Sequence, residues 1–183
     1  MIPSNSAFNT AIFNALCACL ELSPSSPEAS ALIRRAYQEP ESVPKPGRNQ
    51  NVIYCDLAED DSPDASYQVF SGENPTSAGA YPTVSSFLPY RLIVVCYGPA
   101  CVRNANCIRD FIFLDGTGYP RSILRKAGIW PVPRPPVPVL LHEEDGALWR
   151  RRADLVIQLR VTDTCTRENR RPGISEPPAV ILK

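Results

Sequence analysis

The sequence predicts an α+β fold in one domain spanning residues 1–183. Residues 149–162 alternate strictly between two sets of side chains, which is the period of a β-strand with one buried and one solvated face. Apolar residues at three- and four-residue spacing over 5–21 and 100–115 predict helices as well. With 183 residues, 44% of them hydrophobic, the chain is long enough for one core that buries roughly 70% of its unfolded surface.

The first 39 residues are expected to form a pair of helices. The apolar pattern of 5–21 predicts the first, with Ser4 or Asn5 as its N-cap. The segment Ser25-Ser26-Pro27-Glu28 predicts the second, because a serine cap and a proline in the first turn are typical helix starts. Pro40 is expected to end this helix, and the proline-rich residues 40–50 to form a linker.

The core is expected to span residues 50–165. Strands are predicted over 51–58 and 89–97, with a short one over 66–72 and an interaction loop over 72–85. The acidic cluster Glu59–Asp61 is expected to end the first strand as a solvated turn, with a divalent cation as the alternative ligand. A helix over 100–115 capped by Gly116 and a shorter one from Pro120, closed by Gly128, are predicted to follow.

A long hairpin is predicted after these helices. Five prolines in 130–138 require extended chain, a strand is expected over 139–142, and the acidic residues up to Gly146 are expected to form its tight turn. The alternating strand 149–162 then returns, and it is far longer than the usual ~5–6 residues. Its far end, with Trp149 and three arginines, is therefore expected to meet something outside the domain. Residues 166–183 are expected to be a polar tail, in which 179–182 could add a last edge strand.

The zero net charge conceals an asymmetry between the two halves of the chain. Residues 1–89 carry four basic and ten acidic side chains, or −6, and residues 90–183 carry fifteen basic and nine acidic, or +6. The difference is compatible with chance, because the halves can interleave in space. It is also what a subunit with one acidic and one basic surface would show.

No catalytic, cofactor-binding or metal-ligating residue is predicted, and the chain is not expected to be an enzyme. It has no phosphate-binding glycine loop and no C-x-x-C, and its only histidine, His142, is expected at the rim of a hairpin. The seven cysteines are expected to be buried thiols rather than zinc ligands or disulfides. No apolar run approaches the ~20 residues that cross a bilayer, and no signal peptide is expected, which predicts a soluble protein made in a cytoplasm.

Two further motifs have alternative interpretations. Arg150–Arg152 could bind nucleic-acid backbone, or an acidic neighbour, or form ordinary interface salt bridges. On a strand these side chains separate, so that Arg150 and Arg152 share one face and Arg151 lies with Trp149 on the other. The proline-rich 130–138 is interpreted as a structural bridge, with an SH3-type ligand as the alternative.

The order of motifs over 107–162 resembles the phage neck terminator family, the tail terminator or tail-completion proteins of tailed bacteriophages. The motifs are a helix (CIRDFIFLDG), a short helix ending in KAGIWP, a proline-rich bridge (VPRPPVPVL), an acidic-glycine turn (EEDGALW) and an arginine-started strand (RRRADLVIQLRV). The resemblance covers roughly residues 50–165 and is most specific over 126–162. The helical start, the acidic loop and the tail after 163 lie outside it.

This resemblance implies a mixed, mostly antiparallel sheet with helices packed on one side. It also implies a structural virion protein that assembles as a ring, typically a homohexamer, at the head-proximal end of the tail tube. Such a ring ends tube polymerisation and docks to the head–tail connector, and viral DNA passes through its lumen. The implied partners are the tail tube protein, connector or adaptor proteins, and a sheath protein if the tail is contractile. Another neck, connector or tube component is the alternative, and a hydrolase using the acidic clusters 59–61 or 143–145 is a more distant one.

Overall fold

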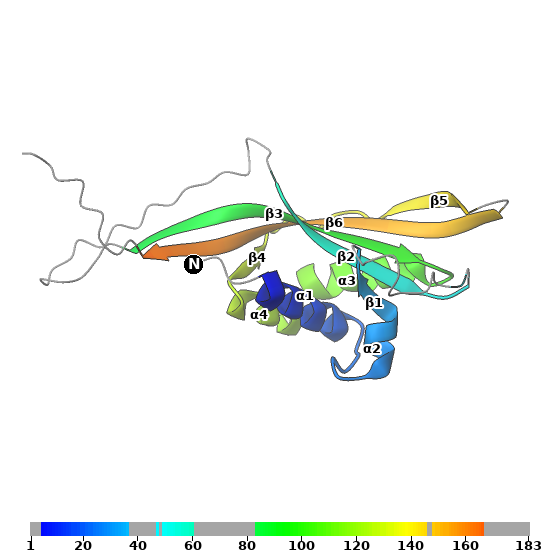
Figure 1. Ribbon diagram of the computed structural model, residues 1–183, viewed down its shortest axis with the longest axis horizontal. Coiled ribbons are helices and arrows are strands. Elements are labelled where there is room, and N and C mark those ends of the chain that lie inside the picture. The colour runs from blue at the N-terminus through cyan, green and yellow to red at the C-terminus, as the bar shows by residue number, and fades with distance from the viewer. Residues whose placement is uncertain (1–4, 37–46, 48, 61–82, 146–147, 167–183) are drawn as a thin grey trace, which may run out of the picture.

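A layer of helices covers one face of a six-stranded sheet (Figure 1). The structure, a computed structural model, describes residues 5–36, 47, 49–60, 83–145 and 148–166. The elements in chain order are α1 (Asn5–Cys19), α2 (Pro27–Leu32), β1 (Ile33–Arg35), β2 (Val52–Glu59), β3 (Thr83–Tyr97), α3 (Cys101–Phe113), α4 (Tyr119–Lys126), β4 (Ile129–Pro131), β5 (Val139–Asp145) and β6 (Leu148–Thr166).

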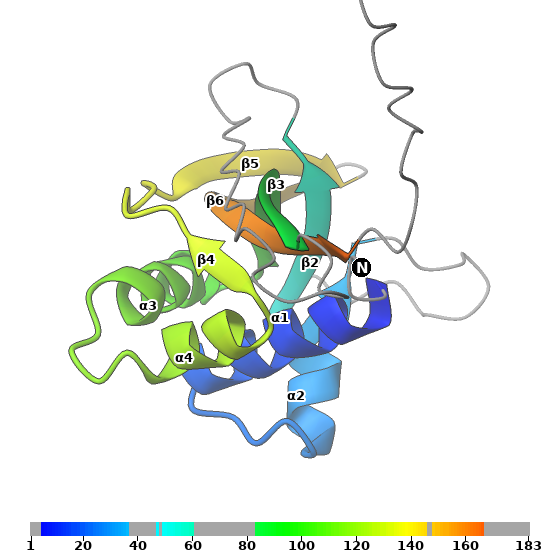
Figure 2. The ribbon, with the colours of Figure 1, turned by 90° about the vertical axis from the view of Figure 1, so that its left-hand side faces the viewer.

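The strand order is β1-β2-β3-β6-β4, and β5 pairs with β6 as well. The β1–β2 pair is parallel and the other pairs are antiparallel. Figure 2 shows the helices gathered on one side of the sheet and β5 on the far side of β6 from them. The expected α+β class, with a mixed, mostly antiparallel sheet and helices on one side, is confirmed.

Two very long strands form the centre of the sheet. β3 has 15 residues and β6 has 19, against the usual 3–10. They pair along the whole of β3, from Thr83 opposite Thr166 to Tyr97 opposite Arg152. The predicted alternation of β6 is confirmed over the core, where every second residue is buried: Ala153, Leu155, Ile157, Leu159 and Val161. The residues between them, from Val156 to Arg160, face away from the helices and are exposed.

The helices complete the core from below the sheet. α1, α3 and α4 bring fully buried side chains against β3 and β6: Phe8, Leu16, Ile108, Ile112 and Leu124. Burial of each such side chain stabilises the fold by about 1.5–3 kcal/mol. The helical predictions over 5–21, 100–115 and from Pro120 are confirmed, although α3 ends at Phe113 and its C-cap is Leu114 rather than Gly116. Gly128 closes α4 with φ +75°, as expected of a helix-terminating glycine.

The second predicted helix is much shorter than expected. Ser26 caps it, its side chain accepting a hydrogen bond from the Ala29 amide, and Pro27 is its first residue, as predicted. The helix nevertheless ends at Leu32, because Ile33 takes an extended conformation and begins β1. Buried Ile33 gains a parallel pairing with β2, opposite Ile53. The expectation of a helix up to Pro40 is therefore wrong.

The predicted loop 72–85 is wrong at its end, because β3 begins at Thr83 rather than Pro89. Pro89 lies inside the strand, where a proline would normally cost a ladder hydrogen bond. Its carbonyl accepts from the Asp60 amide, so its missing N–H faces β2 one residue beyond the point where that strand ends. The loss is therefore confined to the margin of the β2–β3 ladder.

The predicted acidic turn is also wrong, because β5 continues through Glu143, Glu144 and Asp145. These residues pair with Arg150, Trp149 and Leu148 of β6. Opposite charges across a strand pair are favourable, which accounts for the Glu143–Arg150 pair; Glu144 and Asp145 extend the ladder opposite Trp149 and Leu148, with no opposite charge across from them. β6 likewise continues to Thr166, four residues beyond the predicted alternation of 149–162.

The proline-rich bridge runs between β4 and β5, both of which pair with the same edge of β6. Val132 donates its amide to the Gln158 carbonyl, and residues 132–138 have no regular structure. The predicted strand over 66–72, most of the loop 72–85, most of the linker 40–50 and the tail with 179–182 lie outside the described residues.

Candidate interaction surfaces

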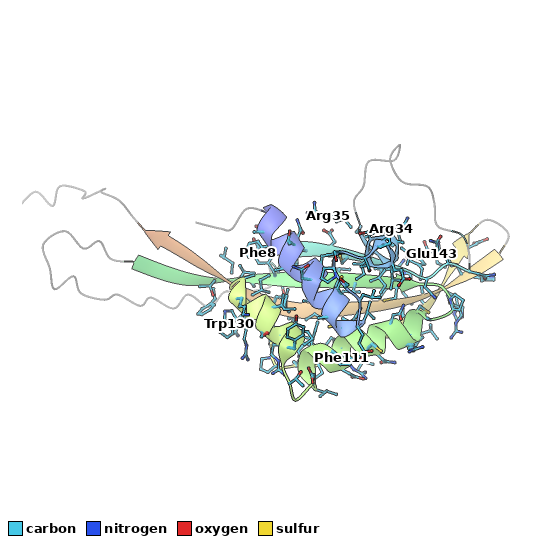
Figure 3. The ribbon with its side chains drawn as sticks, turned by 90° about the horizontal axis from the view of Figure 1, so that it is seen from below. Phe8, Arg34, Arg35, Phe111, Trp130 and Glu143 are labelled. Carbon is cyan, nitrogen blue, oxygen red and sulfur yellow. The ribbon has the colours of Figure 1, made fainter. Side chains whose placement is uncertain are left out.

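The sheet extends past its helical cover at both ends. Figure 3, seen from the helical side, shows β3 and β6 continuing beyond α1 and α4 at one end, and β5 with β6 beyond α3 at the other. At the second end, Trp149 is 66% exposed, and Glu144 lies directly opposite it on β5. We call this pair the Trp149 tip. The prediction that this strand outruns its core is confirmed.

β5 adds more exposed apolar surface next to the tip. Val139, Leu140 and Leu141 are all exposed. Because consecutive residues of a strand point to opposite faces, β5 exposes apolar side chains on both of its faces. β5 pairs only with β6 among the described strands, so its other edge presents backbone groups that no described strand uses. An exposed apolar edge strand is a common place for another chain to bind.

The opposite face of this end carries a network of charged and aromatic side chains, the Arg150 cluster (Tyr97, Glu143, Arg150, Arg152 and Asp154). Arg152 donates two hydrogen bonds to Asp154, at 2.7 and 2.6 Å, and lies 3.6 Å from a Glu143 oxygen. The Tyr97 hydroxyl donates to Glu143 at 2.6 Å. The guanidinium of Arg150 lies 4.5 Å from the centre of the Tyr97 ring.

Burial and hydrogen bonding raise the pKa values of two members of this cluster. Burial first, and then the hydrogen bond to Glu143, raise the pKa of Tyr97 to about 12. The hydrogen bonds to Asp154 raise the pKa of Arg152 above its ordinary value. The four charged groups balance, because two arginines face two carboxylates. Since Glu143 belongs to β5, the arginines to β6 and Tyr97 to β3, this network stabilises the packing of these three strands.

The burial of Arg150 was not predicted from the sequence. It is only 6% exposed, while Trp149 and Arg151 on either side are exposed. Its Nε and Nη2 have no hydrogen-bond partner in the described part of the chain. Its stacking on Tyr97 compensates part of that cost. The predicted division of the three arginines, with Arg150 and Arg152 on one face and Arg151 on the other, is confirmed by the register.

A groove of about 330 Å³ lies at the other edge of the sheet, between α1 and the strands β1 and β2. We call it the α1–β2 groove. Apolar side chains from α1 and β2, among them Phe13 and Leu57, form much of its wall, and Arg34 and Arg35 of β1 border it (Figure 3). Arg34 donates through Nε to the Ala31 carbonyl, but its buried Nη1 has no hydrogen-bond partner among the described residues. Sequence reasoning missed this groove because it expected β1 to be helix.

The first acidic cluster of the hydrolase alternative, residues 59–61, has two described members, and both contact residues of β3. Glu59 accepts a hydrogen bond from the Tyr90 hydroxyl at 3.2 Å, and Asp60 lies 3.6 Å from Arg91. Asp60 is buried, so the expected solvated turn is wrong at that residue. His142 is exposed on β5. Within residues 5–36, 47, 49–60, 83–145 and 148–166, no three His, Cys, Asp or Glu side chains lie where they could share a metal ion.

The thiols behave as structural side chains. Cys17, Cys19, Cys96 and Cys101 are buried, as predicted, whereas Cys55 and Cys107 are half-buried. Burial raises the pKa of Cys19 and Cys96 to about 12. These thiols therefore stay protonated and unreactive near neutral pH.

No protein-family model matches this chain, and no curated protein matches it either. No described helix is both long enough and apolar enough to span a membrane.

Proposed function

We propose that the protein is a structural subunit of a phage virion that forms a ring at the head-proximal end of the tail tube. In this role it ends tube polymerisation and joins the tail to the head connector, and viral DNA passes through its lumen. Its partners are further copies of itself, six in number on the resemblance to neck terminators, together with the tail tube protein and connector proteins.

One observation supports this proposal above the others: the central sheet is longer than the core that its own helices cover. Trp149 and three apolar residues of β5 are exposed at one end, and the β3–β6 ribbon continues past the helices at the other (Figure 3). A protein that acts alone gains little from exposing such surface. A ring subunit needs two different contact surfaces so that head-to-tail interfaces can close.

The order of motifs over 107–162 supports the same role through its resemblance to neck terminators. Within this role, Trp149 or the loop 72–85 contributes contacts between subunits. The sheet face that carries Arg150 and Arg152 lies at a subunit boundary or at the lumen. Because Arg150 is only 6% exposed and Arg152 is paired with Asp154, these arginines act there by stabilising that face.

The test is negative-stain imaging of the purified full chain over a range of concentrations. The proposal predicts particles with a central hole and one rotational symmetry. Globular particles of single-subunit size at every concentration would overturn it, and would direct attention to the alternative of an enzyme.

A further inference from the structure

The Trp149 tip and the α1–β2 groove have complementary chemistry. The tip presents an exposed indole beside the carboxylate of Glu144, because these two residues are directly opposite in the β5–β6 ladder. The groove presents an apolar wall bordered by Arg34 and Arg35, and Asp56 is also part of its lining, so two positive groups stand against one negative group there. An aromatic anchor with an adjacent acid therefore matches an apolar recess with an adjacent base.

The two surfaces cannot meet within one molecule. β5 lies on one side of β6, whereas β1 and β2 lie at the other edge of the sheet, with β3 between them and β6 (Figure 1). The Trp149 tip of one copy can therefore enter only the α1–β2 groove of another copy. Such a contact is heterologous, so each copy uses both surfaces and repetition gives a ring when the rotation closes.

We propose that the Trp149 tip of one copy docks in the α1–β2 groove of the next, with Glu144 paired to Arg34 and Arg35. The occupant is a second copy of this chain, and the inference rests on the proposed ring and names its interface. The groove's 330 Å³ is in the range of recesses that enclose small molecules, and is large enough for an indole side chain.

The electrostatic part of the contact follows from the incomplete hydrogen bonding of Arg34 in the groove. Arg34 keeps one buried guanidinium nitrogen without a hydrogen-bond partner in the described chain. A buried donor in that state is costly, and a carboxylate is the acceptor that a guanidinium binds best. Glu144 and Arg35 are both exposed, so the Glu144 carboxylate pairs with Arg35 when the indole beside it enters the groove. The buried Arg34 nitrogen gains the same acceptor only when its side chain turns outward.

Disulfide trapping tests the proposal directly. The double variant Arg35→Cys with Glu144→Cys places one thiol on each surface, and both positions are exposed. Under mild oxidation we expect a ladder of covalent oligomers on a non-reducing gel that stops at the size of the ring. The matched control combines Glu144→Cys with Lys126→Cys. Lys126 is an exposed residue of α4 that does not line the groove, so the control should run as a monomer on the same gel.

Charge reversal gives a second readout. Arg35→Glu and Glu144→Arg should each weaken self-association by about 2- to 5-fold, the range for a pair at an interface rim. The two changes together should restore it. Lys126→Glu, the control, should leave the dissociation constant unchanged.

The outcomes separate this inference from the proposed function. If the native chain forms rings but the Arg35→Cys with Glu144→Cys variant gives no ladder of covalent oligomers, the docking is wrong and the ring stands. A groove filled by another partner, or by residues of the same chain, would give this result. A ladder without rings would support the docking and overturn the ring. If neither a ladder nor any self-association is seen, both are wrong.

Discussion

The two tryptophans of this chain are both exposed but differ in their contacts, and replacing each with alanine separates assembly from folding. Trp149 is 66% exposed at the end of the β5–β6 hairpin. Trp130 is 42% exposed, but it donates from Nε1 to the Thr162 hydroxyl at 3.2 Å, and Arg125 lies 5.3 Å from its ring centre. The two substitutions are chemically identical, so any difference between them comes from position.

The expected magnitudes follow from these contacts. Trp149→Ala should change the free energy of unfolding of the subunit by no more than about 0.5 kcal/mol, as for other surface substitutions. If Trp149 anchors an interface, the same change should weaken association by about 2 kcal/mol, which is roughly 30-fold in the dissociation constant. Trp130→Ala removes a hydrogen bond of about 1 kcal/mol and a cation–π contact of about 0.5–1 kcal/mol. It should therefore destabilise the subunit and leave association almost intact.

Urea unfolding followed by circular dichroism measures the first quantity, and sedimentation velocity measures the second. Circular dichroism is preferred to fluorescence because each variant loses one of the two tryptophans. The reasoning is refuted if Trp149→Ala lowers the unfolding free energy as much as Trp130→Ala does. It is equally refuted if Trp149→Ala leaves the dissociation constant unchanged.

Three further predictions concern the folding of the subunit. Gly98→Ala should lower the unfolding free energy by about 1–3 kcal/mol in urea titrations, because φ is +97° and an added Cβ would lie 2.7 Å from the Asn51 side-chain oxygen; a neutral result would contradict this. The stabilising hydrogen bond from Tyr97 to Glu143 needs the protonated phenol, whose pKa is raised from 10 to about 12 in the fold. Its contribution is thus complete below pH 10 and lost as the pH rises toward 12, and Tyr97→Phe should flatten the alkaline part of a stability–pH profile. Glu21 has φ +55°, and Glu21→Gly should stabilise the subunit by about 0.5–1 kcal/mol in thermal or urea unfolding; destabilisation would show that its side chain makes a needed contact.

Periodic segments were predicted well because their burial comes from their own sequence. The alternation of β6 and the helical spacing of α1 and α3 each reflect one face packed against the core. The helix stop at Gly128 follows from its left-handed conformation, which glycine adopts without strain.

The errors arose where pairing partners far along the chain decide the structure. Ile33 fits a helix locally, but a parallel pairing beside Ile53 places it in a strand. The acidic residues after His142 look like a turn until Arg150 and its neighbours are seen opposite them. Local composition contains no information about such partners.

The candidate surfaces could be predicted only in part. The free end at Trp149 follows from the length of one alternating run, and the structure bears it out. The α1–β2 groove and the burial of Arg150 on Tyr97 depend on contacts between separate elements. No spacing within a single segment indicates either of them.

Native mass spectrometry of the full chain tests the central claim most directly, because it counts the subunits in each particle. A ring subunit of 20.2 kDa should give one dominant closed species, with six copies as the number that the family resemblance implies. A spectrum that contains only the 20.2 kDa chain, or an open-ended series of masses without a dominant member, would contradict the account.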